Sequence, residues 1–598
     1  MTLILGISAY YHDSAVCLIK NGEIIYAAQE ERFSRIKHDS SFPKKSLHNL
    51  LKYCSIKISD LSAIVFYDKP FLKFERLIET YLSFCPKGFK QYLKAIPIWV
   101  NDKLFLKKML IEEIKLFDKK FNGKNLFFSE HHLSHAASAF YPSPFEKAII
   151  LTADGVGEWT TTSISIGYKN KIKIEKEIFF PHSIGLLYSA FTYFLGFKVN
   201  SGEYKVMGLA PYGKDRFKKI IKEKLINIKD DGSFHLNQNF FEYATGFQMT
   251  NNKFEKLFGI KKRLPETAIK QIHKDIAASI QSVTEEVMLK ICLSLKKTYN
   301  LENLCLAGGV ALNCVVNGKI LSKKIFKNVW VQPAAGDAGG AMGAAFAYYY
   351  IEKKNSRKIH KNDQMKDALL GPKFSPSNIL QTLNKNKILF QKLSENNLIK
   401  VVAFELSKGK AVGWFQDKME FGPRALGSRS IIADPRKKKM QKLLNLKIKF
   451  RESFRPFAPS VLYEDAKKWF DLKVESPYML IVANLKKKGK AVSKLEKTVS
   501  KIPAVTHVDY SARIQTVKNK KLKYYKLLKE FKKITGVPIL VNTSFNIRGE
   551  PIVCSPQDAI NCFLGTDLDL LVLENFIIYK KEQDKSLIHD YKNSYQLD

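Results

Sequence analysis

Short apolar runs and longer stretches with helical periodicity alternate along the first 350 residues. Unbroken apolar runs at Leu3–Ser8 and Lys147–Ala153 predict buried strands, and the Asn-Gly pair at residues 21–22 predicts a tight hairpin between Ala15–Lys20 and Glu23–Gln29. Other strands are predicted at residues 63–67, 125–128, 160–166, 303–306 and 329–332, and helices from about residue 129 and at residues 182–196, 273–296 and 338–350. This alternation indicates mixed or mostly parallel α/β layers.

The pattern changes after Glu352, where residues 353–367 are mostly polar and predict a linker. A chain of 598 residues is too long for one hydrophobic core. We place a first domain at residues 1–355 and a second domain at residues 375–598. The second domain also reads as α/β, with strands predicted at residues 411–415 and 539–541 and helices near residues 437–446 and 521–534.

The formal net charge of +41 raises the question of a nucleic-acid partner. Only 13 of the 98 basic residues are arginines, however, and the 85 lysines are spread along the whole chain. Dispersed lysines are typical of a solvated surface, so nucleic acid is not the expected partner. Arginine is more informative, because its planar fork binds phosphate or carboxylate at two points. Seven arginines lie between residues 424 and 548, although structural ion pairs would account for some of them: Arg424, Arg429, Arg436, Arg451, Arg455, Arg513 and Arg548.

Cellular location is suggested by three negative features of the sequence. No apolar run approaches the roughly 18 residues needed to span a bilayer. Residues 1–20 lack a basic leader region, so they do not read as a signal peptide. The eight cysteines form neither a CxxC pair nor a dense framework. We therefore expect a cytoplasmic protein with reduced thiols.

Three glycine-centred turns follow predicted strands, at residues 6–14, 154–157 and 307–313. Glycine lets backbone amides approach phosphates closely, and a helix N-terminus after each turn would favour anions. Neither a Walker A motif nor a GxGxxG motif is present. The order of the three turns resembles the split nucleotide clamp of the actin, sugar-kinase and heat-shock-ATPase superfamily, with Gly155, Gly157, Gly308, Gly309 and Asn313 as candidate nucleotide contacts.

A candidate metal site lies on the helix predicted from residue 129. His131 and His135 are four residues apart, so they share one helix face and can bind one divalent ion. Glu130 and the distant Asp337 supply candidate oxygen ligands. His132 points to another face and is interpreted as structural. Because a histidine pair on a helix is often structural, spacing alone leaves metal binding and packing equally open.

Cations and short polar side chains are concentrated in four segments of the second domain. The segments are residues 420–429, 449–457, 506–513 and 542–550. Their combination suits a polyphosphate or an acyl phosphate. The alternative is a set of turns stabilised by serine and asparagine.

With these segments in view, the chain resembles the O-carbamoyltransferase family of antibiotic, cephamycin and nodulation-factor biosynthesis. The resemblance runs from Ile4 to Phe576. It rests on HHLSHAASA at residues 131–139, GEYKVMGLAP at 202–211, GGVALN at 308–313, FGPRALGSR at 421–429 and NTSFNIRGEP at 542–551.

The resemblance implies two kinds of domain. The first would be a duplicated actin-like domain similar to the tRNA threonylcarbamoyl-transferase, with a metal, usually iron, on His131, His135 and Asp337. The second would be an α/β domain similar to threonylcarbamoyl-adenylate synthase. The Lys-x-Arg and Ser-x-Asn signature of that synthase falls on Lys449, Arg451, Ser544 and Asn546.

The implied reaction has two stages. Carbamoyl phosphate and ATP, the latter with Mg²⁺, would form carbamoyl-adenylate in the second domain. The first domain would pass the carbamoyl group to a hydroxyl of a small molecule or sugar. The implied catalytic residues are His12, Asp13, Lys449, Arg451 and Ser544, with His12 or Asp13 as the base. Phosphate and nucleotide contacts would add Lys205, Arg424, Thr506, Arg513, Asn546 and Arg548.

Two alternatives stay open. One is a tRNA-modifying enzyme that transfers a threonylcarbamoyl group, and the other is a non-catalytic actin-like module that binds ATP. Residues 71–110 alternate aromatic, apolar and basic positions at helical spacing, which predicts a helical insertion. Ordinary packing explains such a pattern more often than the lining of an acceptor site does, but this is the region expected to decide among acceptors. The acceptor, the metal, the pathway and a homodimeric state are not decided by the sequence.

Overall fold

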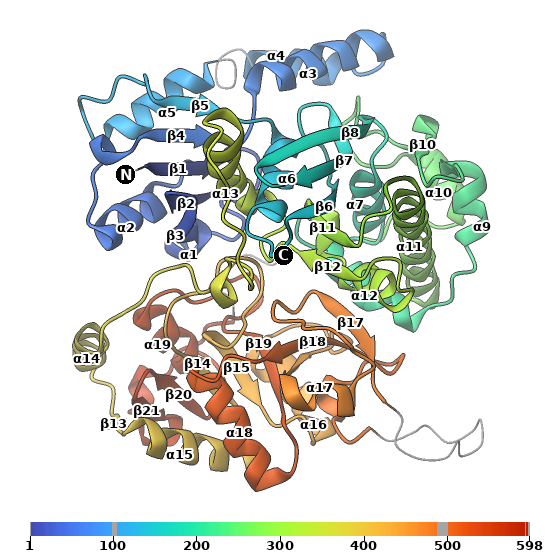
Figure 1. Ribbon diagram of the computed structural model, residues 1–598. Coiled ribbons are helices and arrows are strands. Elements are labelled where there is room, and N and C mark those ends of the chain that lie inside the picture. The colour runs from blue at the N-terminus through green and yellow to red at the C-terminus, as the bar shows by residue number, and fades with distance from the viewer. Residues whose placement is uncertain (1, 99–104, 487–499, 593, 596–598) are drawn as a thin grey trace. The chain divides into compact units, whose positions relative to one another are not determined.

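The computed structural model describes residues 2–98, 105–486, 500–592 and 594–595 (Figure 1). The chain forms two compact units. Unit 1 comprises Met1–Ser34 and His38–Met365, and unit 2 comprises Arg35–Lys37 and Lys366–Asp598. The division after Met365 falls within the polar stretch that follows Glu352. Each unit is described in turn.

Unit 1 begins with a mixed sheet that is five-stranded in its described part. Its strands, in the order β3-β2-β1-β4-β5, are β1 (Leu3–Ser8), β2 (Ala15–Lys20), β3 (Glu23–Gln29), β4 (Ala63–Phe66) and β5 (Leu126–Phe128). Strand β2 is antiparallel to β1 and β3, whereas β4 and β5 continue parallel to β1. The first three strands and their hairpin have the predicted bounds.

A second sheet of unit 1 repeats this topology. It contains β6 (Lys147–Ala153), β7 (Thr160–Tyr168), β8 (Lys171–Phe179), β11 (Asn303–Ala307) and β12 (Asn328–Val331), in the order β12-β11-β6-β7-β8 over the described residues. Here too the first three strands form an antiparallel meander and the last two run parallel to the first. The same strand order twice in one unit confirms the predicted duplicated α/β domain.

Two helices pack against each other between these sheets. Helix α6 (His131–Phe140) contacts β6 and β11, and α13 (Asp337–Ala347) contacts β1 and β2 (Figure 1). The helices approach closely because small residues face the contact: a β-carbon on Gly343 of α13 would lie 1.6 Å from the carbonyl oxygen of Ser134 on α6. Helix α13 lies equally close to β1, where a β-carbon on Gly6 would lie 1.8 Å from the carbonyl oxygen of Ala341. This packing sets the distance between the candidate metal ligands on the two helices.

We expect Gly343→Ala to destabilise unit 1, because the added methyl group meets backbone atoms that cannot move aside. Overpacking of this kind costs about 1–3 kcal/mol of unfolding free energy. Thermal or urea unfolding measures it. Gly155→Ala is the matched control, because a β-carbon there would meet only Leu186, at 3.9 Å. Equal stability of the two variants would contradict the expected close packing.

The other elements of unit 1 surround the two sheets. Its other strands are β9 (Ile226–Ile228) and β10 (Phe234–Leu236). Its other helices are α1 (Glu31–Ser34), α2 (Lys44–Cys54), α3 (Pro70–Phe84), α4 (Phe89–Ile98), α5 (Leu106–Lys115), α7 (Ile184–Phe194), α8 (Glu203–Leu209), α9 (Lys218–Ile220), α10 (Asn252–Phe258), α11 (Gln271–Tyr299) and α12 (Cys314–Ser322). Helices α3 to α5 confirm the predicted helical insertion for its described residues.

Unit 2 is built on one mixed sheet, nine-stranded over the described residues, in the order β13-β21-β20-β14-β15-β19-β16-β18-β17. The strands are β13 (Gln391–Lys392), β14 (Val412–Phe415), β15 (Arg429–Ala433), β16 (Ala458–Leu462), β17 (Ile481–Asn484), β18 (Ser511–Val517), β19 (Ile539–Ser544), β20 (Leu570–Leu573) and β21 (Phe576–Tyr579). The helices are α14 (Pro376–Lys385), α15 (Glu395–Ser407), α16 (Lys438–Leu443), α17 (Tyr463–Trp469), α18 (Lys523–Thr535) and α19 (Pro556–Leu564).

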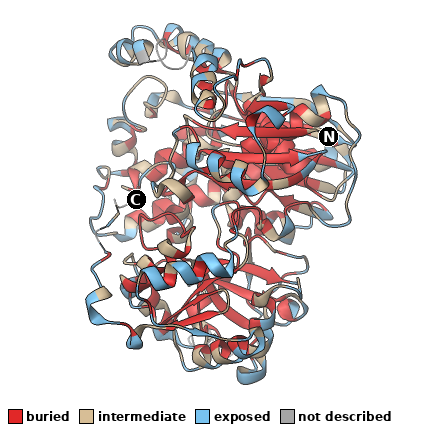
Figure 2. Ribbon diagram, turned by 90° about the vertical axis from the view of Figure 1, so that its left-hand side faces the viewer, coloured by how far each residue is buried: buried red, intermediate tan, exposed pale blue. Residues whose placement is uncertain are grey.

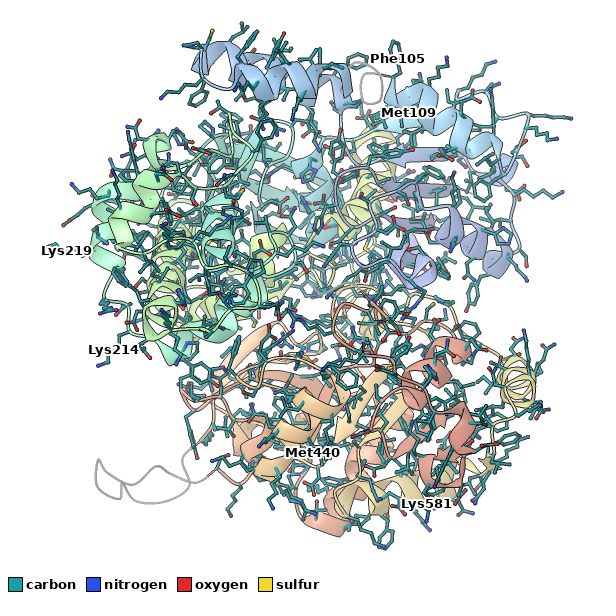
Figure 3. The ribbon with its side chains drawn as sticks, turned by 180° about the vertical axis from the view of Figure 1, so that it is seen from behind. Phe105, Met109, Lys214, Lys219, Met440 and Lys581 are labelled. Atoms are coloured by element: carbon teal, nitrogen blue, oxygen red, sulfur yellow. The ribbon has the colours of Figure 1, made fainter. Side chains whose placement is uncertain are left out.

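Burial follows the strands in both units, whereas many lysines are exposed. The central strands of each sheet are buried along their length (Figure 2). Lys214 and Lys219 of unit 1 and Lys581 of unit 2 are exposed and project into solvent (Figure 3). No helix in the described part of the chain combines the length and apolar character that a membrane span requires.

Candidate functional site

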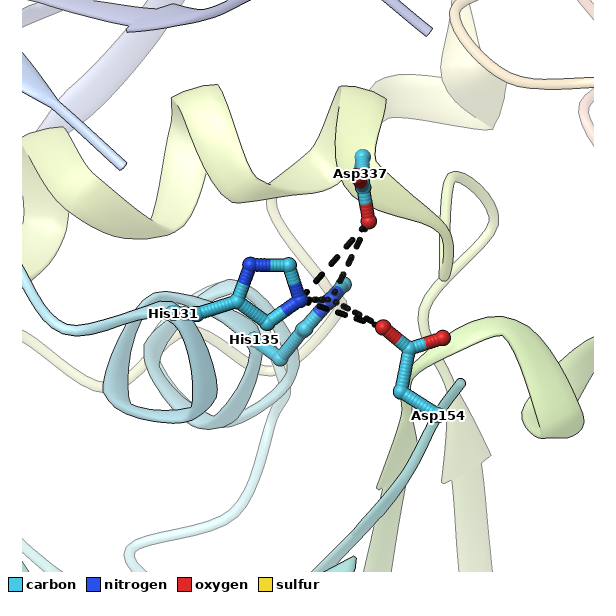
Figure 4. A group of neighbouring side chains, drawn as sticks. All are labelled: His131, His135, Asp154 and Asp337. Atoms are coloured by element: carbon cyan, nitrogen blue, oxygen red, sulfur yellow. Dashed lines mark hydrogen bonds and ion pairs between the residues drawn. The ribbon is translucent and has the colours of Figure 1, made fainter. Parts of the chain in front are cut away.

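Four side chains of unit 1 converge on one point (Figure 4). His131 and His135 come from α6, Asp154 follows β6 and Asp337 begins α13. The Nε2 atoms of the two histidines lie 3.1 Å apart, and Asp154 Oδ2 lies 3.1 Å from His131 Nε2 and 3.4 Å from His135 Nε2. Asp337 Oδ1 is 3.8 and 3.6 Å from the same two nitrogens. The predicted set of His131, His135 and Asp337 is thus brought together.

Neighbouring acidic residues explain how α6 presents this face. The backbone N–H of His131 donates to the buried carboxylate of Glu158, at 3.0 and 3.1 Å, which holds the first turn of the helix. On its other side, His131 Nδ1 lies 3.5 Å from Asp68, so Nε2 is directed to the convergence point. His132 instead meets the Ser163 hydroxyl at 3.0 Å, which fits the structural role predicted for it.

The surroundings of His131 and His132 shift the pKa values of the two side chains in opposite directions. Burial would lower the pKa of His131, but Asp68 and Asp154 outweigh burial and raise that pKa well above its usual value. For His132, burial and the two neighbouring histidines lower the pKa well below its usual value. His132 is therefore neutral, whereas His131 lies where positive charge is favoured.

The donor set fits a divalent transition metal. Two bare imidazole nitrogens 3.1 Å apart repel each other unless a cation or a proton lies between them. Two imidazoles with two carboxylates are ligands that zinc, iron and similar ions accept. The sequence interpretation missed Asp154, because it treated residues 154–157 only as a glycine turn. The position of Asp154 directly after a buried strand is the sequence signal that could have identified it.

Asp154 also connects this cluster to a glycine turn. Its Oδ1 accepts the backbone N–H of Gly309 at 2.8 Å, while its Oδ2 faces the histidines. Gly308 has φ of +83° there, and a β-carbon on it would lie 2.3 Å from the carbonyl of Ala153. Only glycine fits this approach.

After two of the three turns the predicted next strands, at residues 15–20 and 160–166, are confirmed, so neither of these turns is followed by the helix N-terminus that was expected to favour anions. The turns at residues 6–14 and 154–157 join antiparallel strands, so the next element is a strand. Only the turn at Gly308 leads to a helix, through a 3-10 turn into α12.

The other predicted contacts of unit 1 have structural partners. Gly155 accepts a hydrogen bond from Ser183, and a β-carbon on Gly157 would lie 3.0–3.1 Å from His131 and His132. Lys205 is buried in α8. Asn313 caps α12 through Val316 and pairs with Gln281.

His12 and Asp13 form a separate cluster in unit 1, joined by His38. Asp13 lies 3.1 Å from His12 Nδ1 through Oδ2 and 2.8 Å from His38 Nδ1 through Oδ1. A β-carbon on Gly336, next to Asp337, would lie 3.9 Å from Asp13 Oδ2. This cluster therefore borders the metal-ligand cluster. His38 was not among the predicted site residues.

In unit 2, Lys449 is the centre of a buried polar group. It is 2% exposed, and its Nζ donates to the carbonyl oxygens of Ser544 at 2.7 Å and Asn546 at 2.8 Å, and to Ser544 Oγ at 3.2 Å. The backbone N–H of Arg548 donates to the carbonyl of Lys449 at 3.1 Å. The structure thus joins the predicted Lys-x-Arg and Ser-x-Asn segments directly.

The predicted arginines of unit 2 fall into three sets: three near Asn445 or Glu452, two with structural partners, and two elsewhere in the unit. Arg451 bonds to Asn445 and lies over the Phe457 ring, while Arg548 and Arg455 lie 3.6 and 3.4 Å from Glu452. Two others are structural: Arg436 pairs with Asp434, and buried Arg429 donates to backbone carbonyls. Arg424 lies in the β14–β15 loop, Arg513 on β18, and Thr506 bonds to Ser500 and Ile502.

Comparisons with known proteins identify the family of the chain. Residues 3–346 match the family model for the carbamoyltransferase N-terminus, and residues 403–580 match the model for the carbamoyltransferase C-terminus. A Synechocystis sp. protein is 51% identical over 99% of this chain and 100% of its own length. Nodulation protein NolNO of Sinorhizobium fredii is 34% identical over 96% of this chain and 80% of its own length.

Among solved structures, component A of (R)-2-hydroxyglutaryl-CoA dehydratase from Acidaminococcus fermentans aligns with 58% of this chain and 98% of its own, at 14% identity and a TM-score of 0.32.

On the family models and the nodulation relative, the chain belongs to the carbamoyltransferase family. It is accordingly an enzyme, which sets aside the non-catalytic module considered from the sequence.

Proposed function

We propose that this carbamoyltransferase uses ATP and acts on hydroxyl groups. Unit 2 would make carbamoyl-adenylate from carbamoyl phosphate and ATP, and unit 1 would transfer the carbamoyl group to an acceptor. The observation that carries the proposal is the buried Lys449 amine, which faces the oxygens of Ser544 and Asn546. Burial and the nearby Arg451 lower the pKa of Lys449 well below its usual value. An anion bound beside the amine would offset that burial and favour its charged form.

In the first stage, water would cleave carbamoyl phosphate into carbamate and inorganic phosphate. A carbamate oxygen would bond to the α-phosphorus of ATP, the bond to the β-phosphate oxygen would break, and pyrophosphate would leave. Lys449, Arg451 and Arg548 would bind the phosphates, with Arg424, Thr506 and Arg513 as further contacts. Ser544 and Asn546 would orient the Lys449 amine, which they already contact.

In the second stage, a hydroxyl oxygen would attack the carbamoyl carbon and AMP would leave. His131, His135, Asp154 and Asp337 would hold a divalent cation. Such a cation would act as a Lewis acid toward oxygen atoms of the adenylate. The Gly308–Gly309 turn would lie beside it, with the Gly309 N–H donated to Asp154. A hydroxyl of a small molecule or sugar is the proposed acceptor.

The test is pyrophosphate release from ATP, with and without carbamoyl phosphate and with no acceptor present. We expect release that depends on carbamoyl phosphate, because adenylate formation needs no acceptor. Release that is independent of carbamoyl phosphate, or no release, would contradict the adenylate pathway. The family assignment would stand in either case, and direct transfer from carbamoyl phosphate would replace the adenylate pathway as the proposed reaction.

A further inference from the structure

A short segment from near the start of the chain belongs to unit 2. Residues Arg35–Lys37 follow α1 in the sequence and are part of that unit. Arg35 anchors the segment: its Nη2 donates to Glu550 Oε1 at 2.7 Å and to the carbonyl oxygen of Pro551 at 2.9 Å, and its Nη1 donates to that of Ile552 at 2.8 Å. The backbone of Arg35 is left-handed, with φ of +63°. Such a conformation is sparse outside glycine and persists where surrounding contacts outweigh its cost.

Glu550, the partner of Arg35, is a fully buried carboxylate. Its Oε1 also accepts the hydroxyl of Tyr591 at 2.9 Å, and its Oε2 accepts the backbone N–H of Ile547 at 2.9 Å. Burial raises the pKa of Glu550, and Arg35 is the largest influence in the opposite direction. Loss of the guanidinium would therefore leave a buried carboxylate without the cation that is bonded to it, which is costly.

The same carboxylate lies at the end of the loop that faces Lys449. Asn546 Nδ2 donates to the carbonyl oxygen of Glu550 at 2.6 Å, and the carbonyl oxygen of Asn546 accepts Lys449 Nζ at 2.8 Å. The backbone N–H of Arg548 donates to the carbonyl oxygen of Lys449 at 3.1 Å. A continuous series of hydrogen bonds thus runs from the Arg35 guanidinium through Glu550 and Asn546 to the Lys449 amine.

We infer that Arg35 is a positioning residue of the proposed adenylate-forming site: it holds Glu550, and Glu550 holds the loop that orients the Lys449 amine. The inference rests on the proposed formation of carbamoyl-adenylate in unit 2. That site is then complete only with residues 35–37, which precede the rest of unit 2 by more than 300 positions in the sequence. The role of Arg35 is to fix the position of the amine, since its own donors are bonded to Glu550 and to backbone carbonyls.

The first test compares arginine substitutions in the full chain. Arg35→Gln should reduce carbamoyl-phosphate-dependent pyrophosphate release in the first turnover by about 10- to 100-fold, because a small displacement of the amine is enough for such a loss. Arg35→Lys keeps a single charged donor and should lose less. Arg436→Gln is the matched control, because it removes another arginine ion pair of unit 2, with Asp434, and should stay within about twofold. Full release by Arg35→Gln would overturn the inference.

The second test separates positioning from a loss of folded protein. Millimolar guanidinium, well below denaturing concentrations, should restore release several-fold in Arg35→Ala, because the ion can bind between Glu550 and the carbonyls that Arg35 contacts. It should not restore Lys449→Met. The double variant of Arg35→Gln and Glu550→Gln should lose no more than the worse single variant, because both act through one pair. Losses that multiply, or a folded Arg35→Ala that guanidinium does not restore, would overturn the inference.

Hydrogen exchange distinguishes failure of this inference from failure of the proposed function, because it needs no substrate. In Arg35→Gln, the amides of Ile547 and Arg548 should exchange about 10-fold faster or more, whereas those of β1 and β6 in unit 1 should keep their rates. Unchanged exchange at residues 547–548 would overturn the role of Arg35 and leave carbamoyl-adenylate formation intact. No pyrophosphate release by the unaltered protein would instead overturn the proposed function, and the exchange rates would still show whether Arg35 holds the loop.

Discussion

Lys449→Met is expected to reduce carbamoyl-phosphate-dependent pyrophosphate release by about 10²- to 10³-fold, the usual loss for one preorganised donor at a charged transition state. The amine lies buried against the oxygens of Ser544 and Asn546, so it is held in place before a substrate arrives. Methionine has a similar length and no charge. The measurement is pyrophosphate formed in the first turnover, with saturating ATP and carbamoyl phosphate.

Lys447→Met is the matched control for this substitution. Lys447 is two residues away, 65% exposed and 3.6 Å from Asp567 at the surface. A surface pair of this kind contributes little, so its loss should leave the rate within about twofold. Lys449→Met also leaves two buried carbonyls without a donor, at about 1–3 kcal/mol each, so circular dichroism should verify the fold. Equal rates in the two folded variants would contradict the role of Lys449.

The strands of unit 1 were predictable because burial on both faces produces unbroken apolar runs, as in β1 and β6. The pairing of His131 with His135 was predictable because one helical turn separates them. Asp337 was one of two candidate oxygen ligands, with Glu130, and spacing could not choose between them because Asp337 lies on α13, far along the chain. Helical spacing therefore predicts neighbours within a helix, but not what a second helix adds to the site.

Asp154 and His38 escaped prediction for a related reason. Each reaches its cluster through a chain reversal, Asp154 at the turn between β6 and β7 and His38 in the segment after α1. No periodicity in sequence encodes such a position. At the turns after β1 and β6 the next strands were predicted, and only the expected helix N-termini were wrong, because a glycine after a strand suits a chain reversal as well as a helix entrance. Arg429 shows a similar limit, since its backbone partners appear only once the β14–β15 loop is folded.

His131→Ala is expected to abolish metal binding and to reduce carbamoyl transfer by about 10²-fold or more, while first-turnover pyrophosphate release persists. Outer partners of metal ligands already contribute about 10- to 100-fold to affinity or activity, so a direct ligand should contribute at least as much. The separation is expected because His131 lies in unit 1 and Lys449 in unit 2. Elemental analysis of the bound metal, AMP formation and pyrophosphate release measure the three effects.

His132→Gln is the control on the same helix. His132 meets Ser163 and lies outside the group of converging ligand atoms, so it does not replace His131 as a ligand. We expect this variant to keep the metal and to lose only stability. A chelator applied to the unaltered protein should reproduce the His131→Ala pattern, and a divalent metal should reverse it. If His131→Ala lost pyrophosphate release together with transfer, adenylate formation would depend on the histidine cluster, and the two stages could not be assigned to separate units.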